Sequence, residues 1–337
     1  MTSETAFAEA NPLEASESVA SNVAAKDEHA VAKDGGSPEN SHLDENVVPV
    51  LSLSLAERAR HILSDVTLYH PNFLGLLNEA EWMVREPRRS RARGIFLAAD
   101  PGMGKTLLSQ ELARMFPMQN RPRDSLNEGA WCAVSISMSG ARRTKAVLNR
   151  ILEATGAPIG KTVTIGDQEI AVVAHLRRLN CGLLILDETQ DLLGAQETEQ
   201  LRVMEVIKYL MNELSLPVLA LGTNPESTPF KLDPHLAARF EIMPLPAWEV
   251  GDDLATFLSD YERTLPLKRA SGLSKKSIQE FLVKRSGGIT DGILRCLRNA
   301  ALWAMVDGTE RITVELLGRA RYRPDIEFIK QELNHAA

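Results

Sequence analysis

The chain has few cysteines, few aromatic residues and no long apolar segment. Its cysteines, Cys132, Cys181 and Cys296, are too few and too scattered for a disulfide framework or a metal site, and each lies in an apolar segment. The seven histidines show no metal-ligand spacing. No apolar stretch approaches the ~20 residues that span a bilayer, and the N-terminus lacks the basic and apolar regions of a signal peptide. We therefore expect a cytoplasmic protein with buried, reduced cysteines and no membrane association.

Negative charge is concentrated at the N-terminus. Residues 1–50 carry ten acidic residues and two lysines among many Ala, Ser and Asn, a composition that favours a disordered acidic tail. Because the whole chain has a formal charge of −7 and this tail −8, the remainder carries +1. The acidic isoelectric point of 5.6 therefore does not argue against a DNA-binding surface.

A glycine-rich octapeptide, Ala-Asp-Pro-Gly-Met-Gly-Lys-Thr at residues 99–106, lies between an apolar strand at 95–98 and a helix expected to start at Leu107. It predicts a phosphate-binding loop in which backbone N–H groups surround a polyphosphate, Lys105 neutralises the β/γ oxygens and Thr106 can ligate Mg²⁺. The first glycine of the usual pattern is replaced by alanine, which is small enough for the turn. The expected nucleotide-binding residues are Pro101, Gly102, Met103, Gly104, Lys105, Thr106 and Leu107.

A second motif, at residues 183–188, is an apolar run that ends in Asp187 and Glu188. A run without alternation suits a strand buried on both faces of a parallel sheet, and ligands of such sheets collect at the carboxyl ends of the strands. Both carboxylates should therefore lie beside the phosphate-binding loop. We assign Asp187 to Mg²⁺ and Glu188 to the water that attacks the γ-phosphate, which together predict a P-loop ATPase.

Strand and helix patterns alternate from residue 95 to residue 221. This alternation predicts an α/β fold with a doubly wound, mostly parallel sheet. Two amphipathic helices are expected ahead of the first strand, at 53–63 and 71–85. From about residue 252 the pattern is helical only, which predicts a small helical domain after the sheet.

Two further segments can complete the nucleotide site. The strand at 217–222 ends in a polar pair, of which we favour Thr223, with Asn224 as the alternative, as a sensor of the γ-phosphate. Residues 233–240 are expected to form a helix that ends in Arg239 before an extended segment at 241–245. Offered across a subunit interface, Arg239 would stabilise transition-state charge, an effect of about 10³ to 10⁵ in rate in other P-loop systems. It could equally be a C-terminal helix charge that complements the helix dipole.

The order of these motifs resembles an AAA+ ATPase with a helical lid. Several segments more closely resemble the TniB/TnsC family of transposition ATPases, and the similarity covers about residues 53–320. These segments are Leu186–Gly194, Met211–Leu214, Leu221–Thr223, Leu236–Phe240, Leu245–Trp248, Leu265–Leu267 and Ser286–Ile289. The Leu-Pro-x-Trp and Ser-Gly-Gly elements among them are not general AAA+ features.

Two positions depart from the family pattern. Gln190 stands where the family usually has histidine. Asp291 or Gly292 lies where many AAA+ lids carry a second sensor arginine, although Arg295, one turn later, could substitute.

The resemblance implies a division of the chain into an acidic tail at 1–50, an AAA+ base domain at 51–248, a helical lid at 249–322 and a C-terminal tail at 323–337. It also implies ATP as the nucleotide. The adenine pocket would be walled by Tyr69 and His70 and by the lid near Gly287 and Gly288.

The family's function is implied in the same way. ATP would drive assembly of a ring or helical homo-oligomer on target duplex DNA, which recruits a DDE-type transposase and a TniQ-family protein. Two other functions share the ATP site: an AAA+ helicase or clamp loader, and a nucleotide-gated DNA-binding module with negligible turnover. Glu188 and Arg239 argue against the second of these.

Two basic clusters compete as the DNA-binding surface. Arg142, Arg143 and Lys145 follow the second strand, in a loop that resembles the family's pore-facing DNA loop, and Lys161 lies in a nearby segment. The other cluster, Arg85 to Arg93, precedes the first strand. Lys and Arg contacts to phosphates are independent of base sequence, and no aromatic residue interleaves with either cluster to stack on single strands. We prefer the first cluster, on duplex phosphates.

Overall fold

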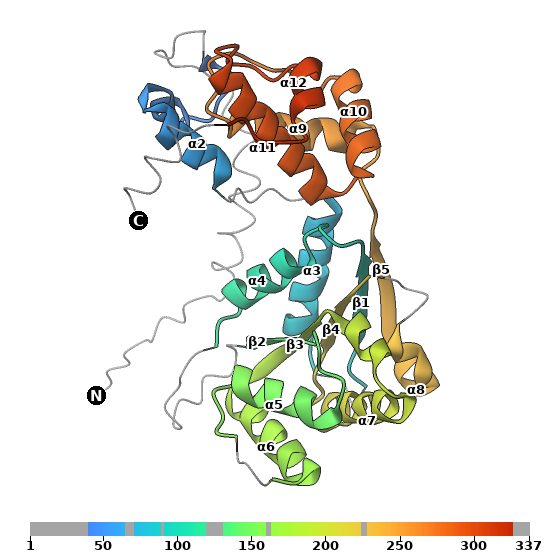
Figure 1. The fold of residues 1–337 in the computed structure, drawn as a ribbon. Helices are drawn as coiled ribbons and strands as arrows, with labels where there is room; N and C mark the ends of the chain where they lie inside the picture. The colour runs from blue at the N-terminus through green and yellow to red at the C-terminus, as the bar shows by residue number, and fades with distance from the viewer. Residues whose placement is uncertain are drawn as a thin grey trace, which may run out of the picture. The chain divides into compact units, whose positions relative to one another are not determined.

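The computed structural model describes residues 40–64, 71–88, 91–118, 131–159, 163–223 and 228–325. From His42 onward the chain forms one compact unit, which holds a parallel sheet and a set of helices (Figure 1). Four residues named above, Tyr69, His70, Lys161 and Asn224, lie outside the described residues, as does the acidic tail up to residue 39.

Five strands form the sheet in the order β2-β3-β4-β1-β5, and every pairing is parallel. Their bounds are β1 Gly94–Ala99, β2 Cys132–Ser137, β3 Cys181–Asp187, β4 Val218–Gly222 and β5 Phe240–Leu245. Strands β1, β3 and β4 are buried along their whole length, as unalternating apolar runs predict. The predicted parallel α/β fold is confirmed, and the extended segment after Arg239 is its fifth strand, with Phe240 opposite Gly94.

Helices cover both faces of the sheet because successive strand residues point to opposite sides (Figure 1). Ile95 and Leu97 of β1 pack in one apolar cluster with α3 (Pro71–Arg85) and α4 (Lys105–Met115). Phe96 and Ala98 pack in the other, with helices from the second face. The second face is covered by α5 (Thr144–Ala154), α6 (Ile165–Arg178) and α7 (Glu197–Glu213).

Short elements shape the ends of the strands. Helix α4 begins at Lys105, two residues before the expected start, because Gly104 adopts a φ of 98° and acts as the N-cap. A 3-10 helix, η4 (Thr189–Gly194), follows β3, and η5 (Pro229–Leu232) follows β4. Helix α8 (Pro234–Ala237), capped by the Asp233 side chain, ends before Arg239, so the helix predicted to reach that arginine is shorter than expected.

Only helices follow the sheet among the described residues. They are α9 (Asp252–Arg263), α10 (Lys276–Ser286), α11 (Thr290–Val306) and α12 (Val314–Arg319). Cys132, Cys181 and Cys296 are buried, and none of them forms a disulfide bond.

The N-terminal segment packs on these helices rather than on the sheet. It contains η3 (Val48–Ser52) and α2 (Leu55–Leu63), drawn in blue beside α11 in Figure 1. Leu43 and Val47 are buried, so the prediction of a disordered tail up to residue 50 is wrong for residues 42–50. This stretch is also tied to a distant part of the chain, because the Asp44 N–H donates to the Arg263 carbonyl at 3.0 Å.

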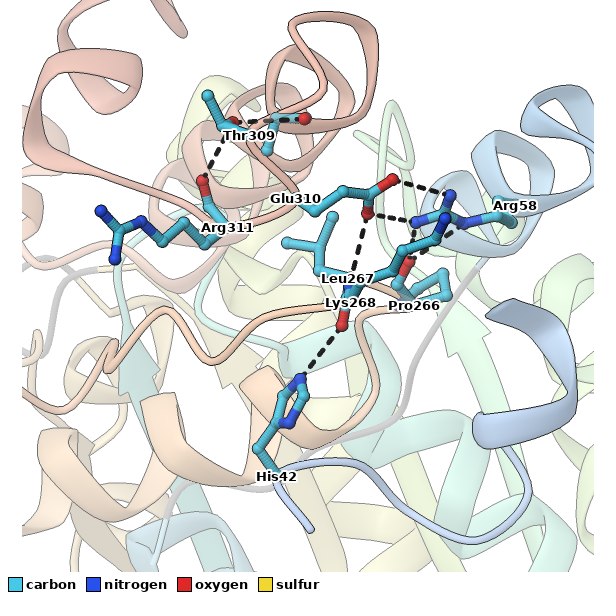
Figure 2. A network of polar contacts seen from close by, with 9 residues as sticks. His42, Arg58, Pro266, Leu267, Lys268, Thr309, Glu310 and Arg311 are labelled. Carbon is cyan, nitrogen blue, oxygen red and sulfur yellow. Dashed lines mark hydrogen bonds and ion pairs between the residues drawn. The ribbon is translucent and has the colours of Figure 1, made fainter. Parts of the chain in front are cut away.

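Arg58 fastens α2 to the helical region, as Figure 2 shows. Its guanidinium is almost fully buried and donates to the Pro266 carbonyl at 2.6 Å and to the Glu310 carboxylate at 2.5 and 3.0 Å. Burial opposes ionisation of Glu310, but the hydrogen bond and charge of Arg58 outweigh it and lower the pKa of that carboxyl. The segment at 51–63, predicted to belong to the base domain, therefore packs with the C-terminal helices.

Candidate nucleotide-binding site

The carboxyl edge of the sheet gathers the predicted nucleotide residues. The phosphate-binding loop follows β1, Asp187 ends β3 with Glu188 directly after it, and Thr223 follows β4. Because β3, β4 and β1 are neighbours and parallel, their carboxyl ends share one edge. The structure thus brings Lys105, Thr106 and the two acidic residues together.

Three hydrogen bonds link the loop to itself and to β3. The Thr106 hydroxyl donates to Asp187 Oδ2 at 3.2 Å. Lys105, only 5% exposed, donates from Nζ to the carbonyls of Ala99 at 2.7 Å and Asp100 at 3.1 Å. Burial lowers the pKa of Lys105, and the charges of Glu188, Asp187 and Asp100 oppose that shift.

The donor atoms suit a magnesium ion. Mg²⁺ prefers oxygen ligands and binds through one or two carboxylates together with phosphate and water oxygens. The Thr106 hydroxyl and the Asp187 carboxylate are such donors and already lie in contact. No group of three or more His, Cys, Asp or Glu side chains in the described part of the chain could hold a metal by itself.

The start of α11 closes over the phosphate-binding loop. The Asp291 N–H donates to the Gly102 carbonyl at 3.1 Å, and the Thr290 hydroxyl lies 3.6 Å from Met103 Sδ. Gly102 has a φ of 83°, and Ile289 lies 3.0 Å from the point that a Cβ at Gly102 would occupy. A side chain at this position would be strained by the positive φ and would press on Ile289.

Arg295, which could substitute for the missing second sensor arginine, lies near the first residues of the phosphate-binding loop. It lines a cavity of about 530 Å³ together with Pro101, Arg285 and Arg321. The structure therefore brings a cluster of arginines next to the first turn of the phosphate-binding loop.

Glu188 occupies an unusual backbone position. It has a left-handed conformation, with φ 57° and ψ 40°, and its N–H donates to Asp187 Oδ1 at 2.8 Å. The Gln190 amide, from Nε2, donates to Glu188 Oε2. Sequence reasoning noted Gln190 only as a departure from a family pattern and assigned it no role.

Arg239 lies at the opposite edge of the sheet. Its carbonyl accepts the N–H of Gly94 at 2.9 Å, and its Nη1 donates to Asn212 Oδ1 at 2.7 Å, near the end of α7. Both contacts are at the amino ends of the strands. Since β1 rises about 3.3 Å per residue, roughly 16 Å of strand separates Arg239 from the phosphate-binding loop of its own chain. The structure does not bring these two parts of the predicted site together.

The basic loop, residues 138–143, follows β2 at the carboxyl edge, and Lys145 lies directly after it in the first turn of α5. Arg142 and Arg143 are exposed, and neither forms an ion pair within the described residues. Lys145 donates to the Val163 carbonyl at 3.1 Å. The loop is also joined to β3 and to η4. Met138 N donates to the Asp187 carbonyl at 2.6 Å, and Gly140 N donates to Asp191 Oδ2 at 3.0 Å.

Comparisons with known proteins agree with this architecture. The family model described as bacterial TniB protein matches residues 58–250. No curated protein matches the chain. Among the described residues, no helix is both long and apolar enough to cross a membrane.

Two archaeal structures are similar in fold. The Aeropyrum pernix ORC2 protein in its ADPNP-ADP complexes is 17% identical over 77% of this chain and 70% of that one, with a TM-score of 0.53. CDC6P from Pyrobaculum aerophilum is 15% identical over 77% of this chain and 69% of that one, with a TM-score of 0.56. At such identities the likeness shows the fold alone, and it confirms the AAA+ P-loop fold predicted from the motifs.

Proposed function

The chain belongs to the TniB family, and from this premise we propose that it is an ATP- and Mg²⁺-dependent AAA+ ATPase that assembles on target duplex DNA and recruits a transposase. The observation that carries the proposal is the separation of the site's two halves. The loop and acidic residues lie at the carboxyl edge of the sheet, and Arg239 lies at the amino edge.

Self-association follows from that separation. An arginine roughly 16 Å of strand away cannot reach a phosphate bound in its own loop. It can reach the loop of a second copy whose carboxyl edge faces it. ATP bound between two copies would then be contacted by both, and the nucleotide would favour assembly because it binds the oligomer better than the monomer.

The roles of the side chains follow from their chemistry. Lys105 neutralises the β/γ oxygens, Glu188 orients the attacking water, Thr223 senses the γ-phosphate, and Arg239 of the next copy stabilises the charge that develops there. Mg²⁺, when bound by Thr106 and Asp187 with phosphate oxygens, supplies further charge neutralisation. Tyr69 and His70 remain our proposed wall of the adenine pocket.

Duplex DNA is the proposed ligand of the basic loop. Arg142 and Arg143 present exposed guanidinium groups, and we keep Lys145 and Lys161 as additional phosphate contacts. The DDE-type transposase and the TniQ-family protein are proposed from family membership. A chain that acts on cellular DNA in this way would work in the cytoplasm.

Mixing two inactive variants tests the shared site. E188Q keeps Arg239 but lacks the residue that orients water, and R239A keeps Glu188 but lacks the arginine. Mixed in equal amounts with ATP and duplex DNA, the two should recover about a quarter of wild-type turnover, because about a quarter of interfaces combine an intact Glu188 with an intact Arg239. R177A, which breaks an exposed ion pair with Glu213 at 3.0 Å, serves as the matched control and should retain full activity. No recovery in the mixture would overturn the shared site.

Negative-stain microscopy tests the assembly. Wild-type protein with duplex DNA should form rings or filaments with ATP or a non-hydrolysable analogue, and should not form them without nucleotide. Assembly with nucleotide but equal hydrolysis by wild type and E188Q would instead identify a nucleotide-gated binding module.

A further inference from the structure

We infer that Gln190 is a positioning residue for the ATPase reaction, which it serves by orienting the carboxylate of Glu188; the inference rests on the proposed function. The two side chains are joined by a hydrogen bond from Gln190 Nε2 to Glu188 Oε2. A residue that activates water must hold its carboxylate within hydrogen-bond reach of that water.

Glu188 needs an external restraint. Its side chain has three rotatable torsions, and the residue sits in a left-handed turn at the end of β3. No hydrogen bond joins it to its neighbour Lys105 within the described residues, where the Lys105 ammonium donates to the Ala99 and Asp100 carbonyls. A hydrogen bond to Oε2 leaves Oε1 of Glu188 able to accept from water.

The position of the Gln190 amide satisfies only one of its two polar ends. Its Nε2 faces the carboxylate, because turning the amide over would set two acceptors against each other. Its Oε1 is then buried and has no hydrogen-bond partner within the described residues. An unpaired buried acceptor destabilises a fold, so this amide contributes little to stability by itself. The favourable interaction of this side chain is its hydrogen bond to Glu188.

The backbone that carries Gln190 is fixed on both sides. The Thr189 hydroxyl donates to the Leu221 carbonyl of β4 at 2.9 Å. Asp191 accepts the N–H of Gly140, in the basic loop, at 3.0 Å. The residues on either side of Gln190 are therefore bound to β4 and to the basic loop. This fixes the position from which the amide contacts Glu188.

Three substitutions at Gln190 test the inference. Q190L keeps the approximate volume and removes the donor, Q190H supplies a ring N–H donor, and Q190E places a second acceptor and a like charge against Glu188. We expect kcat for ATP hydrolysis to fall about tenfold in Q190L, further in Q190E, and to be largely restored in Q190H. KM for ATP and the affinity for a fluorescent ATP analogue should stay within about twofold of wild type.

Thermal stability separates positioning from a structural role. Because Q190L removes an unpaired buried acceptor, its melting temperature should equal or exceed that of wild type. A lower melting temperature together with weaker nucleotide binding would show that Gln190 supports the fold, which overturns the inference.

A double-mutant cycle with E188Q gives the decisive result. If Gln190 acts through Glu188, Q190L should change single-turnover hydrolysis of radiolabelled ATP about tenfold in the wild-type background and not at all in E188Q. Equal effects in both backgrounds, or wild-type kcat in Q190L, would overturn the inference and leave the proposed function standing. Equal rates in wild type and E188Q would remove the catalytic role of Glu188, and the inference with it.

Discussion

Residues 85–93 and residues 142–145 are both rich in basic side chains, yet the fold uses them differently. The first segment leads into β1 and meets the amino ends of the strands, whereas the second follows β2 at their carboxyl ends. In the first segment Arg88 stacks at 4.1 Å over Trp131 and donates to the carbonyls of Cys181, Gly182 and Ser215 at 3.2 to 3.3 Å. Arg88 is half-buried, and this partial burial lowers the pKa of its guanidinium.

Two other arginines of the first segment, Arg85 and Arg93, pair with acidic side chains. Arg93 pairs with Glu241 at 2.7 Å and with Glu79 at 3.2 Å, and Arg85 pairs with Glu81 at 2.8 Å. Arg142 and Arg143 have no such partner within the described residues. We therefore keep Arg142 and Arg143 as the proposed DNA contacts, because Arg85, Arg88 and Arg93 already have partners within the fold.

The largest effect should come from the half-buried Arg88. Arg88→Met should lower the free energy of unfolding by about 2–4 kcal/mol, because it removes three charged hydrogen bonds and a cation–π contact. Urea denaturation measures this, with Arg91→Met, at an exposed position, as the control. Since the Arg88 guanidinium donates to backbone carbonyls, duplex DNA affinity of the folded variant should match wild type. If Arg88→Met kept full stability but bound DNA weakly, Arg88 would belong to the DNA surface and not to the structural contacts of the fold.

The basic loop should give a large effect on binding instead. Arg142→Ala with Arg143→Ala should weaken ATP-dependent binding to duplex DNA about 10–100-fold, and should reduce the slope of log K against log salt by about 2, since two phosphate contacts are lost. Stability should change by less than about 0.5 kcal/mol. Fluorescence anisotropy at several salt concentrations measures both quantities, and an unchanged slope would exclude this loop as the DNA site.

A smaller effect is expected at Arg93. Its side chain is about one-third exposed at 34%, and the two glutamates it pairs with are exposed to a similar or greater degree. Arg93→Met should cost about 0.5–1 kcal/mol of unfolding free energy, an effect that salt should diminish, without a change in the DNA salt slope. A loss comparable to that of Arg88→Met would mean that the pair is more deeply desolvated than its exposure indicates.

The smallest effect is expected at Arg85, whose pair with Glu81 lies on the surface of α3 at i, i+4 spacing. Arg85→Ala should change stability by about 0.3–0.5 kcal/mol and leave DNA affinity unaltered. Thermal denaturation and the same anisotropy assay measure the two quantities. A clear reduction in DNA affinity would extend the DNA surface to the amino edge of the sheet.

Local motifs predicted the elements of the nucleotide site because their conformations depend on few neighbours. Glycines at 102 and 104 permit the positive φ angles of the loop, and the apolar run before Asp187 is buried on both faces. Since parallel strands place their carboxyl ends at one edge, the meeting of Thr106 with Asp187 could be expected from the sequence.

Other features depend on residues far apart in the chain. Arg58 binds Pro266 and Glu310, more than 200 residues away, and nothing near Arg58 indicates either partner. The same holds for residues 42–50, whose acidic composition predicted disorder although Leu43 and Val47 are buried and Asp44 binds the distant Arg263 carbonyl. Gln190 was noticed in the sequence only as an unusual residue, because its contact with Glu188 depends on the turn that η4 makes.

The parallel α/β framework, the phosphate-binding loop and the acidic pair could be predicted from the sequence, because glycine placement and uninterrupted apolar runs act over a few residues. The folded structure was needed to establish that Arg88 binds backbone carbonyls, that Arg239 lies away from its own loop, and that the N-terminal segment packs with the C-terminal helices. These outcomes depend on which distant groups become neighbours, and burial or pairing by those neighbours sets the role of each charge.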